Sequence, residues 1–118
     1  MLEITTQFFP YRLKLQNREP VELKVSIKNN SNEPTSASFD INTDKTLSLD
    51  KGGYKTAENV ILGVLAPGAI VNKRFDVFAK HMAKKGEHKI YIRAMEHYNN
   101  NYNLIKSEYK KTTEIIVE

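Results

Sequence analysis

Apolar and polar residues alternate one by one along several stretches of this chain. In the clearest stretch, residues 21–28, the apolar positions are Val21, Leu23, Val25 and Ile27. Side chains of a β-strand point alternately to its two faces, whereas a helix would scatter these four positions around its circumference. The pattern therefore predicts a strand over 21–28 with one face in a core.

The same alternation recurs in five more places and predicts strands over 11–16, 37–42, 75–77, 90–95 and 114–118. If these strands form two facing sheets, their inward positions make the core. The residues that we expect to be buried there are Leu23, Val25, Ile27, Phe39, Phe75, Val77, Ile90 and Ile92.

Turn-forming residues separate the predicted strands. Segments 29–34, 51–53 and 99–101 are rich in Asn, Ser, Pro or Gly, which favour turns. Ala66-Pro67-Gly68-Ala69 suits a type II turn, because proline fixes φ at the first central position and glycine supplies a positive φ at the second. Strands at this spacing, without helix-length patterns between them, favour a sandwich or barrel over a βαβ fold.

One segment leaves two alternatives open. Phe78, His81 and Met82 have helical spacing, and Gly86 stands where a helix C-cap would. Residues 79–85 therefore form either a short helical turn or a plain loop between two strands.

Length and composition limit the organisation of the chain. A chain of 118 residues, 40% hydrophobic and 27% charged, has room for one core, so we expect a single domain over residues 1–118. No apolar run approaches the roughly 20 residues that span a bilayer, and Met1–Pro10 lacks the pattern of a signal peptide. We expect a cytoplasmic protein if Met1 is the natural start, and an extracytoplasmic one if the chain is a domain of a larger surface protein.

Three segments together resemble a known family. Residues 18–31, residues 65–68 with 75–77, and residues 86–94 are similar to the corresponding turns and alternating strands of CARDB-type and related prokaryotic immunoglobulin-like domains. The resemblance implies an all-β, immunoglobulin-like, two-sheet antiparallel sandwich of about seven strands. It also implies a non-catalytic module of the kind found in larger surface or secreted proteins. Relatives often carry a tyrosine-corner tyrosine where this chain has His88, whose ring nitrogen is then expected to bond nearby backbone.

Motifs for chemistry are absent from the sequence. The three histidines, His81, His88 and His97, lack the His-x-x-x-His spacing of a helical metal site, and there is no cysteine. The sequence contains neither a Gly-rich phosphate loop nor a Gly-x-Ser-x-Gly elbow. We therefore expect no enzyme activity, no cofactor and no bound metal.

A local excess of basic and aromatic residues suggests a binding surface. It consists of Lys80, Lys84, Lys85, Lys89, Tyr98 and Tyr102. Lysines meeting phosphates and rings stacking on bases would suit a single strand of nucleic acid. The alternative is a solvated connection that blocks edge-to-edge strand pairing, with the tyrosines covering the core.

Taken together, these features predict a non-catalytic interaction or structural module that acts on a protein partner through its loops or an edge strand. The alternative is a carbohydrate- or nucleic-acid-binding accessory domain that uses exposed Tyr and Lys. The alternatives differ in whether Tyr98, Tyr102 and the lysines converge on one surface.

Overall fold

The structure is a computed structural model that describes residues 1–15, 19–98 and 101–118. These residues form strands and connections, with no helix among them. The strands are β1 (Leu2–Phe9), β2 (Arg12–Leu13), β3 (Val21–Asn29), β4 (Thr35–Thr43), β5 (Leu47–Ser48), β6 (Ala57–Leu65), β7 (Ile70–Ala79), β8 (Gly86–Tyr98) and β9 (Asn101–Val117).

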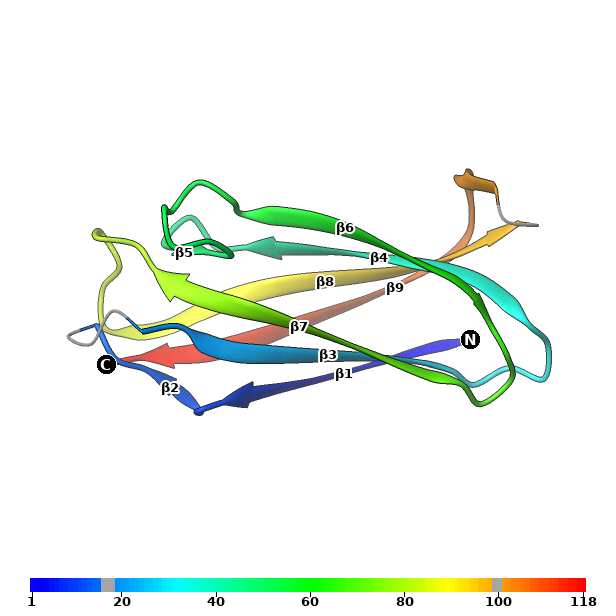
Figure 1. Ribbon diagram of the computed structural model, residues 1–118, viewed down its shortest axis with the longest axis horizontal. Helices are drawn as coiled ribbons and strands as arrows, with labels where there is room; N and C mark the ends of the chain where they lie inside the picture. Colours follow the sequence, from blue (N-terminus) through cyan, green and yellow to red (C-terminus); the bar gives the residue numbers. More distant parts are fainter. Residues whose placement is uncertain (16–18, 99–100) are drawn as a thin grey trace.

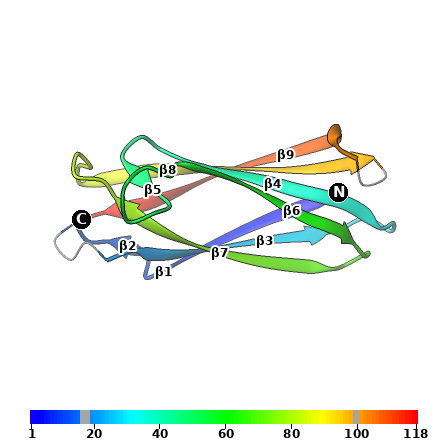
Figure 2. The same ribbon diagram turned by 45° about the horizontal axis from the view of Figure 1, so that its top comes forward.

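The strands form two facing sheets. One has the order β1-β3-β7-β5 and the other β2-β9-β8-β4-β6. Neighbouring strands are antiparallel except for the short pairing of β2 with the end of β9. Figures 1 and 2 show the two layers of this elongated molecule, whose extents are 47 × 24 × 18 Å. The all-β, two-sheet sandwich that the sequence predicts is confirmed, with seven long strands and two of two residues each among the described residues.

The core lies between the sheets and contains all eight residues that the alternation predicts to be buried. On β3, the side chains of Leu23, Val25 and Ile27 are fully enclosed. Phe39 of β4 meets Phe75 of β7 edge to face, with 6.0 Å between ring centroids, so an aromatic contact joins the two sheets.

One predicted strand is much shorter than expected, and three strands, β1, β5 and β6, were not predicted. The strand expected over 11–16 is only Arg12–Leu13, and Tyr11 is 77% exposed. On β1 the core-facing position Thr6 interrupts the apolar series, and on β6 a bulge at Leu62 shifts the alternation by one residue.

The turns predicted at 29–34, 51–53 and 66–69 are present, although Asn29 itself ends β3. Gly68 has φ of 77°, and the backbone N–H of Ala69 donates to Ala66 O at 2.9 Å, as a type II turn requires. Residues 79–85 do not form a helical turn. After β7 ends, the chain makes one tight turn, closed by the Ala83 N–H donating to Lys80 O at 3.0 Å. Of the loop expected at 99–101, residues 99–100 lie outside the described residues and Asn101 begins β9.

His88 bonds to nearby backbone, as expected of a residue in the tyrosine-corner position. Its Nε2–H donates to Lys84 O at 2.6 Å, and its Nδ1 accepts from the Thr46 hydroxyl at 2.6 Å. This tautomer follows from the Lys84 carbonyl, which can only accept. His88 therefore ties the β7–β8 connection to the β4–β5 connection.

Candidate functional site

The predicted site residues lie at opposite ends of β8. Lys80, Lys84 and Lys85 precede this strand and Lys89 is near its start, whereas Tyr98 is its last residue. Nine steps of about 3.3 Å separate Lys89 from Tyr98 and twelve separate Gly86 from it, so the two groups are roughly 30–40 Å apart. The two ends of β8 lie far apart along the sandwich (Figure 1), so the six residues do not share one surface. The end of the sandwich around residues 44–55 and 80–89 is called the lysine end below, and the end around Tyr98 and Tyr102 the tyrosine end.

The lysine end is built from adjoining connections. The backbone N–H of Lys80 donates to Thr46 O at 2.8 Å, which adds to the two bonds of His88. The side chain of Lys80 also passes Gly53, where an added Cβ would lie 3.8 Å from Lys80 Cγ. The β4–β5, β5–β6 and β7–β8 connections therefore form one surface.

The lysines of this end face solvent. Lys84, Lys85 and Lys89 are exposed and Lys80 is half-buried. Within the described part of the chain, none of these four lysines forms an ion pair. Their positive charge is therefore available to a ligand.

At the tyrosine end, Tyr98 and Tyr102 have different surroundings. Tyr102 is half-buried and lies against His97, with 4.8 Å between ring centroids. Tyr98 is 50% exposed, and Lys106 Nζ lies 6.0 Å from its ring centroid. Tyr98 borders a cleft of about 590 Å³, lined also by residues 31–36, Met1, Val64, Glu96, His97 and Lys106.

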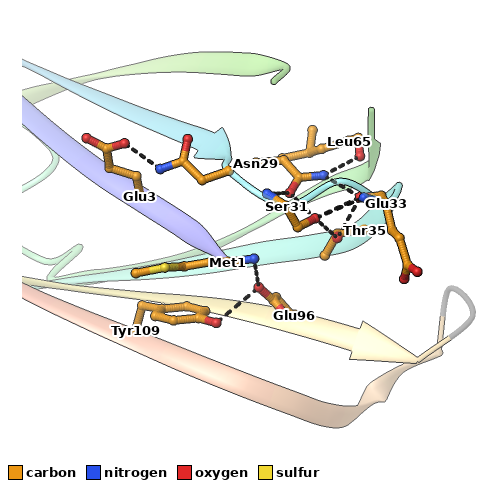
Figure 3. Close-up of polar contacts among 10 residues, drawn as sticks. Met1, Glu3, Asn29, Ser31, Glu33, Thr35, Leu65, Glu96 and Tyr109 are labelled. Carbon is orange, nitrogen blue, oxygen red and sulfur yellow. Dashed lines mark hydrogen bonds and ion pairs between the residues drawn. The ribbon is translucent and has the colours of Figure 1, made fainter. Parts of the chain in front are cut away.

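Asn29 holds one wall of this cleft in place (Figure 3). Its buried side chain donates to Glu33 O and Leu65 O, both at 2.9 Å, and its Oδ1 accepts from the backbone and hydroxyl of Ser31. The β3–β4 connection is thus tied to both β3 and the end of β6. A fully satisfied buried amide of this kind rigidifies the loop around it.

Glu96 is a buried carboxylate at the same end. It accepts from the α-amino group of Met1 at 3.0 Å and from the Tyr109 hydroxyl at 3.2 Å (Figure 3). Burial, reinforced by the negative charge and hydrogen bond of Glu96, raises the pKa of Tyr109 above its usual range. These contacts join the β8–β9 hairpin to the start of β1.

The histidines occupy separate structural positions. His81 lies in the exposed turn after β7, and His88 binds the loops described above. His97 Nδ1–H donates to Leu104 O at 2.9 Å, and its Nε2 accepts from the Ser38 hydroxyl at 2.7 Å. Among the described residues, no three His, Asp or Glu side chains gather as a metal site would require.

Strand β6 is a feature that the sequence reasoning missed. It pairs with β4 on one side and lies at the edge of its sheet on the other. Ile61 and Val64 on this strand are 60% and 55% exposed, and Glu58 is its only charged residue. The apolar run Val60-Ile61-Leu62 and the absence of proline in 57–65 are the signals that could have identified this strand.

Comparisons with known proteins support the fold. No protein-family model matches the sequence, and neither does any curated protein. Among solved structures, the native form of Escherichia coli α2-macroglobulin matches 99% of this chain with a TM-score of 0.71 and 16% identity. The Pseudomonas fluorescens alkylpurine DNA glycosylase AlkC, bound to DNA containing an abasic-site analogue, matches 99% with a TM-score of 0.58 and 15% identity.

This chain covers 6% of the α2-macroglobulin and 30% of the glycosylase. At these identities the likeness shows the fold alone, an immunoglobulin-like sandwich. Within the described residues, no helix has the length and apolar character needed to cross a membrane.

Proposed function

We propose that this domain is a non-catalytic interaction module, of the CARDB-type kind that its sequence resembles, and that it binds an extended segment of a protein partner along the edge of β6. The observation that supports this most is the exposed, nearly uncharged edge of β6 with Ile61 and Val64. A partner strand added to such an edge gains main-chain hydrogen bonds and side-chain contacts at alternate positions.

The other long edges carry features that oppose strand pairing. β9 has charged residues at Lys106, Glu108, Lys110, Lys111 and Glu114. On β7, Lys73 pairs in register with Val25, a core position, so its charge is directed toward the inner side of the sheet. Charges at these places protect an edge from pairing.

Strand β1 is also less available than β6. Its backbone carbonyl at Ile4 accepts from Lys111 Nζ at 3.3 Å, and Thr6 bonds Thr113 across the sandwich at 3.2 Å. Proline follows the strand at position 10. Of the four long edges, β6 therefore has the backbone best suited to a partner.

The bulge in β6 limits the length that pairs regularly. Ala37 lies opposite Gly63 and Ser38 opposite Ile61, so Leu62 has no partner, and Gly63 has φ of 78°. The regular stretch is Ala57–Ile61, a length sufficient for a short peptide strand. Val64 lies beyond the bulge on the same outer face as Ile61, since both are paired with outward residues of β4.

The test compares three baits, the wild type and two double variants, in affinity purification with mass spectrometry. In Ile61→Lys/Val64→Lys, lysines placed on the edge should abolish capture of the partner without unfolding the domain, because both positions are exposed. The matched control, Leu104→Lys/Ile105→Lys, changes two residues that are 51% and 46% exposed on β9. A specific partner should be retained by wild type and control alone, and should protect the amides of 57–61 from hydrogen exchange. Equal capture by all three baits would refute the proposal.

A carbohydrate is the second candidate ligand, because the cleft beside Tyr98 combines an exposed ring with polar groups on a rigid loop. Tyr98→Ala should then abolish binding to a glycan array while Ile61→Lys, at a residue of β6 that does not line this cleft, leaves it unchanged. The opposite result favours the β6 edge.

A further inference from the structure

The net charge of the chain is concentrated at the lysine end. Segments 44–55 and 80–89 contain seven lysines against Asp44, Asp50 and Glu87, a net charge of +4. The whole chain also has a net charge of +4, so the other residues contain equal numbers of basic and acidic side chains. Since the two segments adjoin in space, these seven lysines lie together at one end of the sandwich.

One of the three acidic residues of this end, Asp50, is hydrogen-bonded to backbone. Asp50 Oδ1 accepts from the backbone N–H groups of Tyr54 and Lys55, each at 2.9 Å. Lys55 pairs with Glu58 just outside the segment. The remaining lysines, at 45, 51, 80, 84, 85 and 89, form no ion pair with any residue that the structure describes.

Two large apolar side chains project among these lysines. Tyr54 is 89% exposed and Met82 is 85% exposed, the highest values for large hydrophobic residues in the described part of the chain. They lie in the β5–β6 and β7–β8 connections, where the side chain of Lys80 passes near Gly53. Phe9 and Tyr11, each 77% exposed, come next and lie toward the same end, where β1 ends and β2 begins.

The size of this end favours a lipid surface over a protein as its partner. Its cross-section is set by the two short extents of the molecule, 24 and 18 Å. A stable protein interface usually buries about 800 Å² of accessible surface on each partner, which is a large area for an end of this cross-section. A lipid surface requires less, because a few apolar side chains enter the headgroup region while lysines meet anionic lipids.

We propose that the lysine end docks on membranes that contain anionic phospholipids, with Tyr54 and Met82 entering the interface and the surrounding lysines contacting the headgroups. Tyrosine suits this position, since its ring is apolar and its hydroxyl remains hydrated. The inference is independent of the β6 edge, which lies along the side of the sandwich.

Nucleic acid fits the same end less well. Single strands are held in a basic groove whose aromatic rings stack on the bases. Three clefts among the described residues, including the one beside Tyr98, are lined without any residue of segments 44–55 or 80–89. The end instead has projecting side chains, of which methionine gives no stacking surface.

The experiment is sedimentation with sucrose-loaded vesicles of phosphatidylcholine, alone or with about 30% phosphatidylserine, at physiological ionic strength, where the Debye length is about 8 Å. Wild type should sediment only with the anionic vesicles. Lys84→Glu/Lys85→Glu should lower the partition coefficient at least about 25-fold, since each lysine near the surface contributes roughly fivefold. Lys106→Glu/Lys110→Glu makes the same charge change on β9 and should have little effect.

A second pair of variants tests the apolar contribution. Tyr54→Ser/Met82→Ser keeps every charge and should weaken vesicle binding several-fold, whereas Leu104→Ser/Ile105→Ser on β9 should not. No sedimentation of wild type with anionic vesicles would overturn the proposal. Vesicle binding that Tyr54→Ser/Met82→Ser leaves unchanged would also overturn it. So would a polyglutamate peptide or single-stranded DNA that binds with the same affinity and the same response to the variants, since this end would then be a general polyanion surface.

Discussion

Leu23 shows how a single position of the alternating pattern stabilises the sandwich. It lies on β3, between β1 and β7, opposite Phe8 of β1 and Phe75 of β7. Its side chain has no exposed surface. The neighbours on both strands are large and apolar, so the structure around Leu23 can relax only partly if the side chain is shortened.

Leu23→Ala should therefore lower the free energy of unfolding by about 2–5 kcal/mol, from lost burial and the cavity left behind. Urea denaturation monitored by tyrosine fluorescence measures this change. Leu104→Ala, at a residue that is 51% exposed, is the control and should shift the midpoint only slightly. If the urea midpoint of Leu23→Ala shifts as little as that of the control, Leu23 does not lie in the core.

At the scale of whole elements, the sequence predicts strands well where one face is continuously apolar. β3 meets this condition at every inward position, and its predicted and observed limits nearly coincide. β6 does not, because the bulge at Leu62 places two successive residues against one residue of β4 and breaks the period of two. A bulge depends on the partner strand, so alternation within one segment cannot reveal it.

The candidate site was likewise predicted only in part from the sequence. Alternation indicated that residues 90–95 form a strand, but its extension from Gly86 to Tyr98 is what separates the lysines from Tyr98. The adjacency of segments 44–55 and 80–89 arises from long-range bonds of Lys80 and His88 to Thr46. Such contacts join residues more than 30 positions apart and have no local sequence signal.

The β8–β9 hairpin gives a pH-dependent prediction through Tyr109. Its pKa is raised in the folded protein, whereas an unfolded tyrosine titrates near 10. The folded state therefore holds the proton of the Tyr109 hydroxyl more tightly than the unfolded state does. The contribution of Tyr109 to the free energy of unfolding is complete below about pH 10 and is lost as pH rises through the folded pKa. Tyr109→Phe should show a shallower loss of stability from about pH 9 to 11 in urea denaturation. Tyr98→Phe, at an exposed ring, should retain the wild-type slope. Identical slopes for wild type and Tyr109→Phe would contradict the raised pKa.

At the scale of the whole molecule, the sandwich is a rod whose charge is uneven along its length. The lysine end has seven lysines in segments 44–55 and 80–89, and the tyrosine end has the polar cleft and the buried Glu96. Because β8 holds the two ends roughly 30–40 Å apart, a short ligand contacts one of them at a time. Effects of substitutions at the two ends should therefore add independently.

This separation leads to a prediction for nucleic acid. If Lys80, Lys84, Lys85 and Lys89 bound four phosphates of a single strand, the log–log slope of affinity against salt would be near −3, at about −0.7 per contact. Phosphates alone do not engage Tyr54 or Met82, so we expect no saturable binding of a short labelled oligonucleotide at physiological salt. Fluorescence anisotropy at two salt concentrations measures this, with Lys84→Glu/Lys85→Glu and Tyr98→Ala/Tyr102→Ala compared with wild type. At low salt, any weak binding should respond to the lysine variant alone, because the tyrosines lie beyond the reach of the same strand. If the oligonucleotide binds saturably at physiological salt and both variants weaken it, the two ends act on one ligand. That result would favour nucleic-acid recognition over the membrane and strand-addition proposals.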